Sequence, residues 1–531
     1  MHDRSPLFRP GGGGASVSDS PTCPFDLVST RDTASPVTAA DASPWRRMLR
    51  RYWRAPGMAW GALAVVCIAS RLATTITYIE DPDSLRFALS VADEYDIAAL
   101  QPHFPGYPLF WAAAELFYLP TGSFSTSFAL VGGLATLGLV WALLRLWGRP
   151  LRSVEGTALA GVVALNPLLW LMGNRYMPDL LGTAWAVATL AMLMRAWNGD
   201  GPGRRRAALV GVLLAGLLAG LRLSYLPLVV IPVLLVLARS ARPVRLITAG
   251  GAGVGVWLVP MVLDTGLWTL IDVAWGQTTG HFTDFGGTVQ TESDLGRRLA
   301  GTVQGLWADG LGGWWPGRHW STAFVGAGVA ATGGAGTWRL WRSGTLHGRY
   351  ARMIAAGAVP YALWMFFFQN VVHKSRHVLP LLALLLPVLA AGAAALWRAR
   401  AWPVRGGILA AAGAYAAVTL VLVAQHRTPS AIAQAKAFVE TTAQTDSGPT
   451  RVASVPLVNT YLRTQQVGAR FFSIEDSSDV HRLREAETGR TLVVGTYAPL
   501  LDEAPTRTRT FYHNPHVNRM WPKVTVYVYD H

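Results

Sequence analysis

Apolar runs of about the length of a membrane crossing recur along the 531-residue chain and alternate with short clusters of arginine. A helix needs about 20 mostly apolar residues to cross the hydrocarbon core of a bilayer. Charged residues make up only 15% of this chain, against roughly 25% in soluble domains. The pattern predicts an α-helical polytopic membrane protein with about eleven transmembrane helices. The runs lie at residues 57–77, 123–144, 155–172, 179–196, 207–221, 225–238, 246–263, 320–337, 353–369, 378–396 and 406–424.

The arginine clusters predict the orientation, because loops that stay in the cytoplasm retain Lys and Arg. The basic and aromatic segment 45–54 places the N-terminus in the cytoplasm, and an odd number of spans then puts the C-terminus outside. The short connection around Arg222 is the weakest step in this count. The net charge of +15 reflects topology, so no nucleic-acid partner is expected. The other clusters predicted to be cytoplasmic lie at residues 145–152, 195–206, 239–245, 339–352 and 398–405.

Composition divides the chain into three parts. Residues 1–45 are rich in Gly, Ser and Pro and contain no apolar signal-peptide core, which predicts a disordered cytoplasmic tail. Residues 46–426 form the membrane domain, with long outer loops at 78–122 and 264–319. Residues 427–531 predict a small extracytoplasmic α/β domain. Its predicted elements are a helix over 431–443 capped by Ser430 and strands at 452–455, 470–474, 491–494 and 524–529.

Two short segments of the outer loops have an aromatic and apolar character. Residues 105–118 are interrupted by proline and lie too close to the next span to cross alone, so they predict a helix along the membrane interface. The loop 264–319 carries tryptophans spaced among Gly and Asp, which suits interfacial helices or the wall of a groove. The chain has only 2 cysteines, Cys23 in the tail and Cys67 in the first span, so no disulfide framework is expected.

The first outer loop holds six acidic residues within 80–96, directly after an apolar run. An acid in a loop is often merely solvated, but three features single out Asp83. Pro82 helps to fix the backbone before it, Arg86 follows one helical turn later, and a helix beginning near Ser84 would hold the carboxylate just outside the hydrocarbon. An acid at such an apolar edge can act as a general base.

Basic residues at the predicted outer ends of spans break the positive-inside pattern. They are Arg175, Arg222, Lys374 and Arg376. Taken singly, each of these residues is explained by its long side chain, which can extend to the lipid phosphates. Together, on the same side as the acids, they predict a phosphate-binding pocket at headgroup level. Lys374 and Arg376 stand in the run HKSRH, which includes His377.

A metal site could be built from Asp83, His103 and Asp179. Hard divalent cations take more oxygen ligands than these residues provide, so no cofactor is assigned and a divalent metal is left open. The outer-loop residues His281, Asp284 and His319 are interpreted as solvated or capping side chains.

Three stretches resemble one known family. PDSLRFALSVADEYD followed by HFPGYPLF resembles the first outer loop of the class C glycosyltransferase superfamily, in the branch of protein O-mannosyltransferases and lipid A aminoarabinose transferases. NPLLWLMGNRYMPDLLG and KSRHVLPLLALLLP are similar to two later elements of that family. Ser84 departs from the usual Asp-Glu pair, and His377 stands where the family commonly has Tyr.

The resemblance implies that a sugar is transferred on the outer face from a polyprenyl-phosphate donor to a protein, lipid or glycan acceptor. Asp83 would be the base, and Asp179 would orient the acceptor or a metal. The departing phosphate would be held by Arg222, Lys374 and Arg376. His103 and Tyr107 would line the pocket. The implied substrate-binding set is completed by Arg86, Arg175 and His377.

Two other functions are considered beside the transferase. A lipid or solute transporter would use the same charges along a pathway, but transporters tend to place charges at the bilayer midplane and to show repeated halves. Here most ionisable residues stand at span ends, and no repeat is evident. A membrane scaffold that presents the C-terminal domain would not need acids and bases on one side. The sequence leaves the sugar and the acceptor open.

Overall fold

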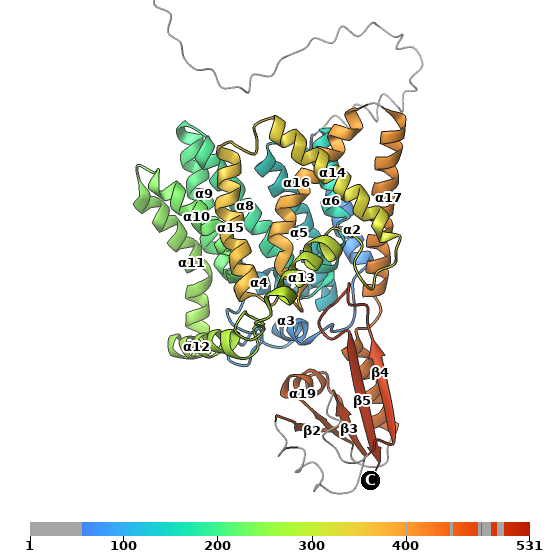
Figure 1. Ribbon diagram of the computed structural model, residues 1–531. Helices are drawn as coiled ribbons and strands as arrows, with labels where there is room; N and C mark the ends of the chain where they lie inside the picture. Colours follow the sequence, from blue (N-terminus) through green and yellow to red (C-terminus); the bar gives the residue numbers. More distant parts are fainter. Residues whose placement is uncertain are drawn as a thin grey trace, which may run out of the picture. The chain divides into compact units, whose positions relative to one another are not determined.

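The computed structural model describes residues 56–399, 401–445, 450–475, 479, 490–495 and 504–530. The predicted tail 1–45 and the basic segment 45–54 lie outside these residues. Every apolar run predicted to span the membrane coincides with a helix, and the third run with a bent pair (Figure 1). These helices are α2 (Pro56–Ala73), α5 (Phe124–Trp147), α6 (Val154–Ala164) with α7 (Pro167–Asn174), α8 (Asp179–Asn198), α9 (Gly201–Arg222), α10 (Pro227–Ala238), α11 (Pro243–Thr265), α14 (Thr322–Arg342), α15 (Arg349–Phe368), α16 (Leu379–Arg398) and α17 (Trp402–His426).

The predicted class of α-helical polytopic membrane protein is confirmed. Among the described residues, 7 helices are long and apolar enough to cross a bilayer, or 8 if α6 and α7, which are bent by 52°, form one span. The helices α2 and α10 are apolar but shorter, so the count of eleven stays a prediction. The connection around Arg222 is a true break, because a 3-10 turn, η1 (Leu223–Tyr225), separates α9 from α10.

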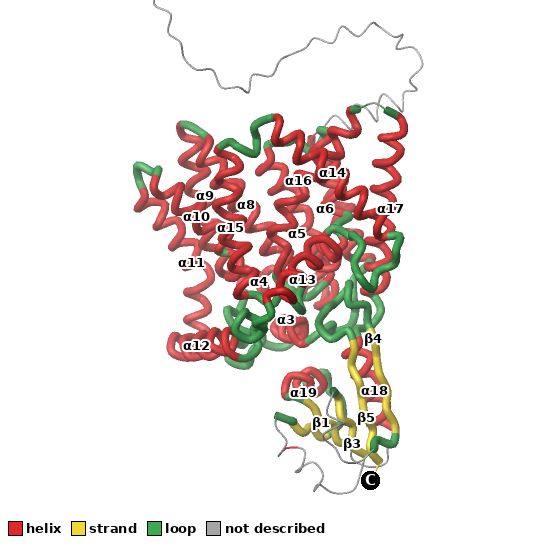
Figure 2. The backbone as a smooth tube through the Cα atoms, in the orientation of Figure 1, coloured by secondary structure: helices red, strands yellow, loops and turns green. Residues whose placement is uncertain are grey.

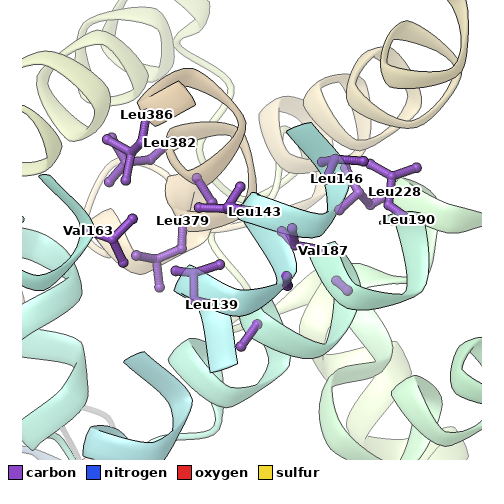
Figure 3. Packing of buried hydrophobic residues seen from close by; sticks show 14 of the residues in the cluster. Leu139, Leu143, Leu146, Val163, Val187, Leu190, Leu228, Leu379, Leu382 and Leu386 are labelled. Carbon is purple, nitrogen blue, oxygen red and sulfur yellow. The ribbon is translucent and has the colours of Figure 1, made fainter. Parts of the chain in front are cut away.

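The helices pack through aliphatic and small residues. Figure 3 shows buried leucines and valines of α5, α8 and α16, among them Leu143, Val187 and Leu382, in one cluster. Lipid tails are as apolar as leucine, so helices in a membrane associate through close packing and hydrogen bonds. Gly392 of α16 illustrates this packing, since a Cβ there would clash with the carbonyl oxygen of Thr332 in α14.

Three of the predicted cytoplasmic clusters meet at one carboxylate. Glu155, at the start of α6, binds Arg149 at 2.8 Å and Arg398 at 3.3 Å, and it also pairs with Arg339. The clusters 145–152, 339–352 and 398–405 therefore share one end of the helical bundle. That this end faces the cytoplasm stays a prediction.

The outer loops form helices at the opposite end of the bundle (Figure 1). Loop 78–122 contains α3 (Pro82–Ala92) and α4 (Pro108–Thr121), the latter over the segment predicted to be an interfacial helix. Loop 264–319 contains α12 (Leu267–Thr283), α13 (Leu295–Gln304) and a π-helical turn, η2 (Gly305–Gly310). Trp268 and Trp275 of α12 are each 77% exposed, as expected for an interfacial helix. A further 3-10 turn, η3 (Ser375–Val378), precedes α16.

The C-terminal part contains α18 (Ala431–Thr445), α19 (Pro456–Arg463) and a five-stranded sheet in the order β2-β1-β3-β5-β4 (Figure 2). Strand β1 pairs parallel with β2 and β3, and β5 pairs antiparallel with β3 and β4. Ser430 accepts the Ala433 N–H at 3.4 Å and so caps α18. The strands are β1 (Arg451–Ser454), β2 (Arg470–Ser473), β3 (Arg490–Val494), β4 (Arg507–Tyr512) and β5 (Lys523–Asp530).

The four predicted strands are confirmed as β1, β2, β3 and β5, but a fifth strand, β4, was missed. This strand lies at the edge of the sheet, and its sequence RTRTFY presents alternating Arg and Thr that are mostly exposed. An edge strand with charged side chains lacks the apolar signal of a central strand, and such charges protect the free edge from pairing with other chains.

Candidate active site

Asp83 stands in the first turn of α3, and the local sequence explains why the helix begins there. Pro82 occupies the first turn, where its missing N–H costs nothing. Asp81 precedes it in extended conformation and accepts the Ser84 N–H at 2.8 Å. The helix therefore begins two residues before the predicted start at Ser84, with Asp81 as its cap. The carboxylate of Asp83 is left for contacts with other segments.

Asp83 binds two cations that lie almost 300 residues away in the chain. Its Oδ2 accepts a hydrogen bond from Lys374 Nζ at 2.7 Å and another from Arg376 Nη2 at 2.7 Å. The side chain of Asp83 is 15% exposed and that of Arg376 is 8% exposed. Burial acts to raise the pKa of Asp83, but Lys374 and Arg376 outweigh it and hold that pKa well below its usual value. Among the described side chains, the hydrogen bonds to Asp83 come from Lys374 and Arg376 and not from Arg86, the neighbour predicted from sequence.

The second carboxylate, Asp179 at the start of α8, is fully buried and is linked to the first. Arg222 Nη2 donates to its Oδ1 at 2.8 Å, and Arg376 Nε lies 3.9 Å from the same oxygen. Arg222 Nη1 donates to the Tyr107 hydroxyl at 3.0 Å, and that hydroxyl lies 3.2 Å from His103 Nε2. The guanidinium of Arg376 thus lies between the two acids.

Except for Asp179, these side chains line a cavity of about 440 Å³. Its wall is formed by α3 and the loop after it, the turn after α9, the end of α12, and the end of α15 with the segment before α16. It combines an excess of positive charge with apolar rings, which suits an anionic group joined to an apolar chain. The predicted residues on the wall are Asp83, Arg86, His103, Tyr107, Arg222, Lys374, Arg376 and His377.

Of the two histidines of this set, His377 is buried and His103 is half-buried. Burial first, and the nearby cations after it, lower the pKa of His103 to about 3, so its imidazole is neutral. The main-chain oxygen of His377 accepts the Tyr361 hydroxyl at 2.7 Å. Among the described residues, no group of three or more His, Cys, Asp or Glu is placed to hold a metal. Asp83, His103 and Asp179 therefore do not form a ligand cluster.

Arg175 has a different environment from the other predicted cations. Its Nη2 donates to Glu80 Oε1 at 2.7 Å and to the Val517 carbonyl at 2.6 Å, and it is not on the cavity wall. His426 Nε2 lies 3.1 Å from the other oxygen of Glu80. Burial acts to raise the pKa of Glu80, but Arg175 and His426 outweigh it and lower that pKa from 4.5 to about 2. These contacts join the first outer loop to α17 and to the C-terminal segment.

Glu80 should make stability depend on acid pH. A carboxyl group whose pKa is depressed by folding stabilises the folded state above its unfolded pKa, and this stabilisation is lost as the group is protonated. We expect the thermal midpoint of the purified protein to decrease as the pH is lowered from about 4.5 to about 2. Glu80→Gln should have a lower midpoint at pH 7 and a smaller fall over this window. Glu94→Gln, at an exposed position of the same loop, is the matched control. Parallel curves for wild type and Glu80→Gln would refute the assignment.

Several wall residues were not predicted from the sequence. His281, interpreted as solvated or capping, lies on the cavity wall with its Nε2 2.9 Å from the Phe368 carbonyl oxygen. Gln277, Phe282 and Trp364 also line the cavity. The tryptophan spacing of loop 264–319 predicted interfacial helices or a groove wall, but no pattern indicated which side chains face the cavity.

Comparison with known proteins extends this description. No known family model matches the chain, and no curated protein matches its sequence. The structure of ArnT from Cupriavidus metallidurans bound to undecaprenyl phosphate has a TM-score of 0.52 at 15% identity, over 88% of this chain and 97% of that one. The apo form of the same protein has a TM-score of 0.49 at 14% identity, over 90% of this chain and 98% of that one. The oligosaccharyltransferase AglB from Archaeoglobus fulgidus has a TM-score of 0.43 at 12% identity, over 84% of this chain and 70% of that one.

The likeness to the ArnT complex shows a shared fold over almost the whole length of both chains. The fold that the resemblance of the three sequence stretches implied is thereby confirmed.

Proposed function

We propose that this protein transfers a sugar from a polyprenyl-phosphate-linked donor to an acceptor on the extracytoplasmic side of the membrane. The observation that carries the proposal is the convergence of Asp83, Lys374, Arg376 and Arg222 on one cavity. The cavity lies at the end of the bundle opposite to the Glu155 cluster. A base and a set of phosphate-binding cations are the two components that displacement of a phosphate from a sugar requires.

The shared fold adds support from a protein with a known ligand. The ArnT structure contains undecaprenyl phosphate, which combines an anionic headgroup with a long apolar chain. The cavity of this chain offers cations for such a headgroup and apolar side chains such as Leu226, Phe282 and Trp364 for the start of the lipid. A soluble nucleotide sugar has no lipid chain that could contact this apolar wall.

The proposed reaction assigns a role to each part of the cavity. The acceptor hydroxyl or amine loses its proton to Asp83 and attacks the anomeric carbon of the sugar. The bond between that carbon and the phosphate oxygen breaks, and the lipid phosphate leaves with the electron pair. Lys374, Arg376 and Arg222 bind the phosphate as its negative charge increases. Asp179 holds Arg222 and Arg376 in place, and Tyr107 extends this network towards His103.

The ion pairs of Asp83 give the reaction an order. With Lys374 and Arg376 bound, the carboxylate is a poor base, because both cations stabilise its charged form. A donor phosphate competes for the same two cations. Once it binds them, Asp83 loses its partners and becomes more basic. Proton removal from the acceptor therefore follows donor binding.

The test is a transfer assay with the purified full-length protein. Undecaprenyl-phosphate hexoses and pentoses with radiolabelled sugars are incubated with the protein and with membranes as the source of acceptors. We expect label from one donor to move to an acceptor while free undecaprenyl phosphate is released. The same sugar on a nucleotide, which lacks the lipid, should give no transfer. No transfer from any donor, together with flux of a substrate into liposomes, would refute the proposal and support the transporter.

A further inference from the structure

Asp309 lies outside the cavity but binds Ser375, the residue between two of the cavity's cations. It belongs to the π-helical turn η2 and is only 2% exposed. Its Oδ2 accepts hydrogen bonds from Arg519 Nη2 at 2.6 Å and from Ser375 Oγ at 2.7 Å, while His516 Nδ1 lies 3.1 Å from its Oδ1. Arg519 Nε also donates to Oδ2 at 2.9 Å. One buried carboxylate thus binds two residues of the C-terminal domain and the residue between Lys374 and Arg376.

Arg519 itself binds the backbone of two segments at this end of the bundle. Its Nη1 donates to the carbonyl oxygens of Gly301 at 3.1 Å, Val371 at 3.2 Å and Val372 at 3.3 Å. Its side chain is only 7% exposed. These carbonyls come from α13 and from the segment 369–377, which also carries Lys374 and Arg376. A planar guanidinium can make such a set of bonds in fixed directions, which a lysine cannot.

We infer that Arg519 and Asp309 are positioning residues, through which the C-terminal domain holds Lys374 and Arg376 at the cavity. The inference rests on the proposed function, in which these two cations bind the donor phosphate. Arg519 fixes the backbone before Lys374, and Asp309 fixes Ser375 between the two cations. A shift of about 1 Å in a group that binds a reacting phosphate is enough to weaken it markedly. The C-terminal domain therefore takes part in donor binding without contacting the donor.

A purely structural role for this contact predicts something different. If Arg519 only joined the two parts of the chain, its loss would lower the thermal stability and leave the affinity of the folded protein for a lipid phosphate unchanged. Positioning predicts a change in affinity and in the KM for donor, with a smaller change in kcat. Binding of undecaprenyl phosphate separates the two roles, and it requires no knowledge of the sugar or the acceptor.

The experiment measures the Kd of purified full-length protein for undecaprenyl phosphate in detergent, alongside the thermal midpoint. We expect Arg519→Ala to raise the Kd about tenfold, as the loss of charge-assisted hydrogen bonds would suggest. Arg519→Lys keeps the positive charge but lacks the planar guanidinium with its several donors, so its affinity should stay close to that of Arg519→Ala. Ser375→Ala leaves the Arg519–Asp309 pair intact and should raise the Kd about threefold. Ser375→Ala also tests the inference if Arg519→Ala does not fold. Arg507→Ala, an exposed arginine on β4, is the matched control and should bind as wild type does.

The outcomes distinguish the inference from the function on which it rests. If wild type binds undecaprenyl phosphate and both Arg519→Ala and Ser375→Ala bind it equally well, the positioning role is refuted while the proposed function stands. If wild type does not bind the lipid phosphate at all, the proposed function itself fails. Weaker binding by Arg519→Ala and Ser375→Ala, with Arg507→Ala unchanged, supports positioning.

Discussion

Asp83→Asn is expected to lower sugar transfer by roughly 10²–10⁴-fold while the protein still binds undecaprenyl phosphate. Asparagine keeps the shape of the side chain but cannot accept a proton from the acceptor. It also no longer competes with the phosphate for Lys374 and Arg376, which both bind Asp83 at 2.7 Å in the wild type. We therefore expect the variant to bind the lipid phosphate at least as tightly as wild type. Single-turnover transfer and equilibrium binding measure the two effects separately.

The matched control for this variant is Asp93→Asn. Asp93 is the exposed C-cap residue of the same helix, so its substitution removes one charge from α3 without changing the cavity. It should transfer sugar at the wild-type rate. Wild-type transfer by purified Asp83→Asn would remove Asp83 from the role of base, and weakened lipid binding would contradict the proposed competition between carboxylate and phosphate.

Arg376→Ala is expected to weaken binding of undecaprenyl phosphate on the order of 10²-fold, because truncation of a buried charge partner typically costs about 2–5 kcal/mol. Arg376 donates to Asp83 at 2.7 Å and lies 3.9 Å from Asp179, so both acids lose a cation with it. The thermal midpoint should fall as well, since Asp179 is fully buried. Binding isotherms and thermal unfolding of the purified protein measure the two losses.

Two further variants sharpen the result for Arg376. Arg376→Lys keeps a positive charge but loses the two-pronged geometry, and it should lie between wild type and Arg376→Ala. Arg349→Ala removes an exposed arginine at the other end of the preceding helix and should bind as wild type does. Unchanged affinity in Arg376→Ala would exclude this side chain from the phosphate site. If the affinity of Arg349→Ala fell equally, net charge rather than position would be the cause.

Asp83 and the cations were singled out in the sequence for reasons that do not depend on their partners. An acid directly after an apolar run and bases at the wrong ends of spans are unusual locally, because charge near a membrane interface follows simple rules. The structure brings Asp83, Arg222, Lys374 and Arg376 to one cavity. Arg175 carried the same signal, but it pairs with Glu80 away from that cavity.

Asp309, His516 and Arg519 gave no signal that could have been recognised. Asp309 is a lone acid in a Gly-rich segment, and Arg519 lies in the stretch HNPHVNRM, which has no helical or strand period. Their proposed role depends on the contact between Asp309 and Arg519, which lie 210 positions apart in the sequence. The edge strand β4 was missed for a related reason, since pairing with β5 stabilises it and its own apolar pattern is weak.

The sequence by itself determined the helical membrane architecture, because transfer of a segment into hydrocarbon depends on the composition of about 20 consecutive residues. It also determined which charges stand at span ends. Only the tertiary structure decided which of those charges meet, since Asp83 finds its cations 291 and 293 residues away. The packing of α3 against α4, α5 and α19 places Asp83 beside these cations, and close packing depends on the shapes of surfaces that no local stretch of sequence contains.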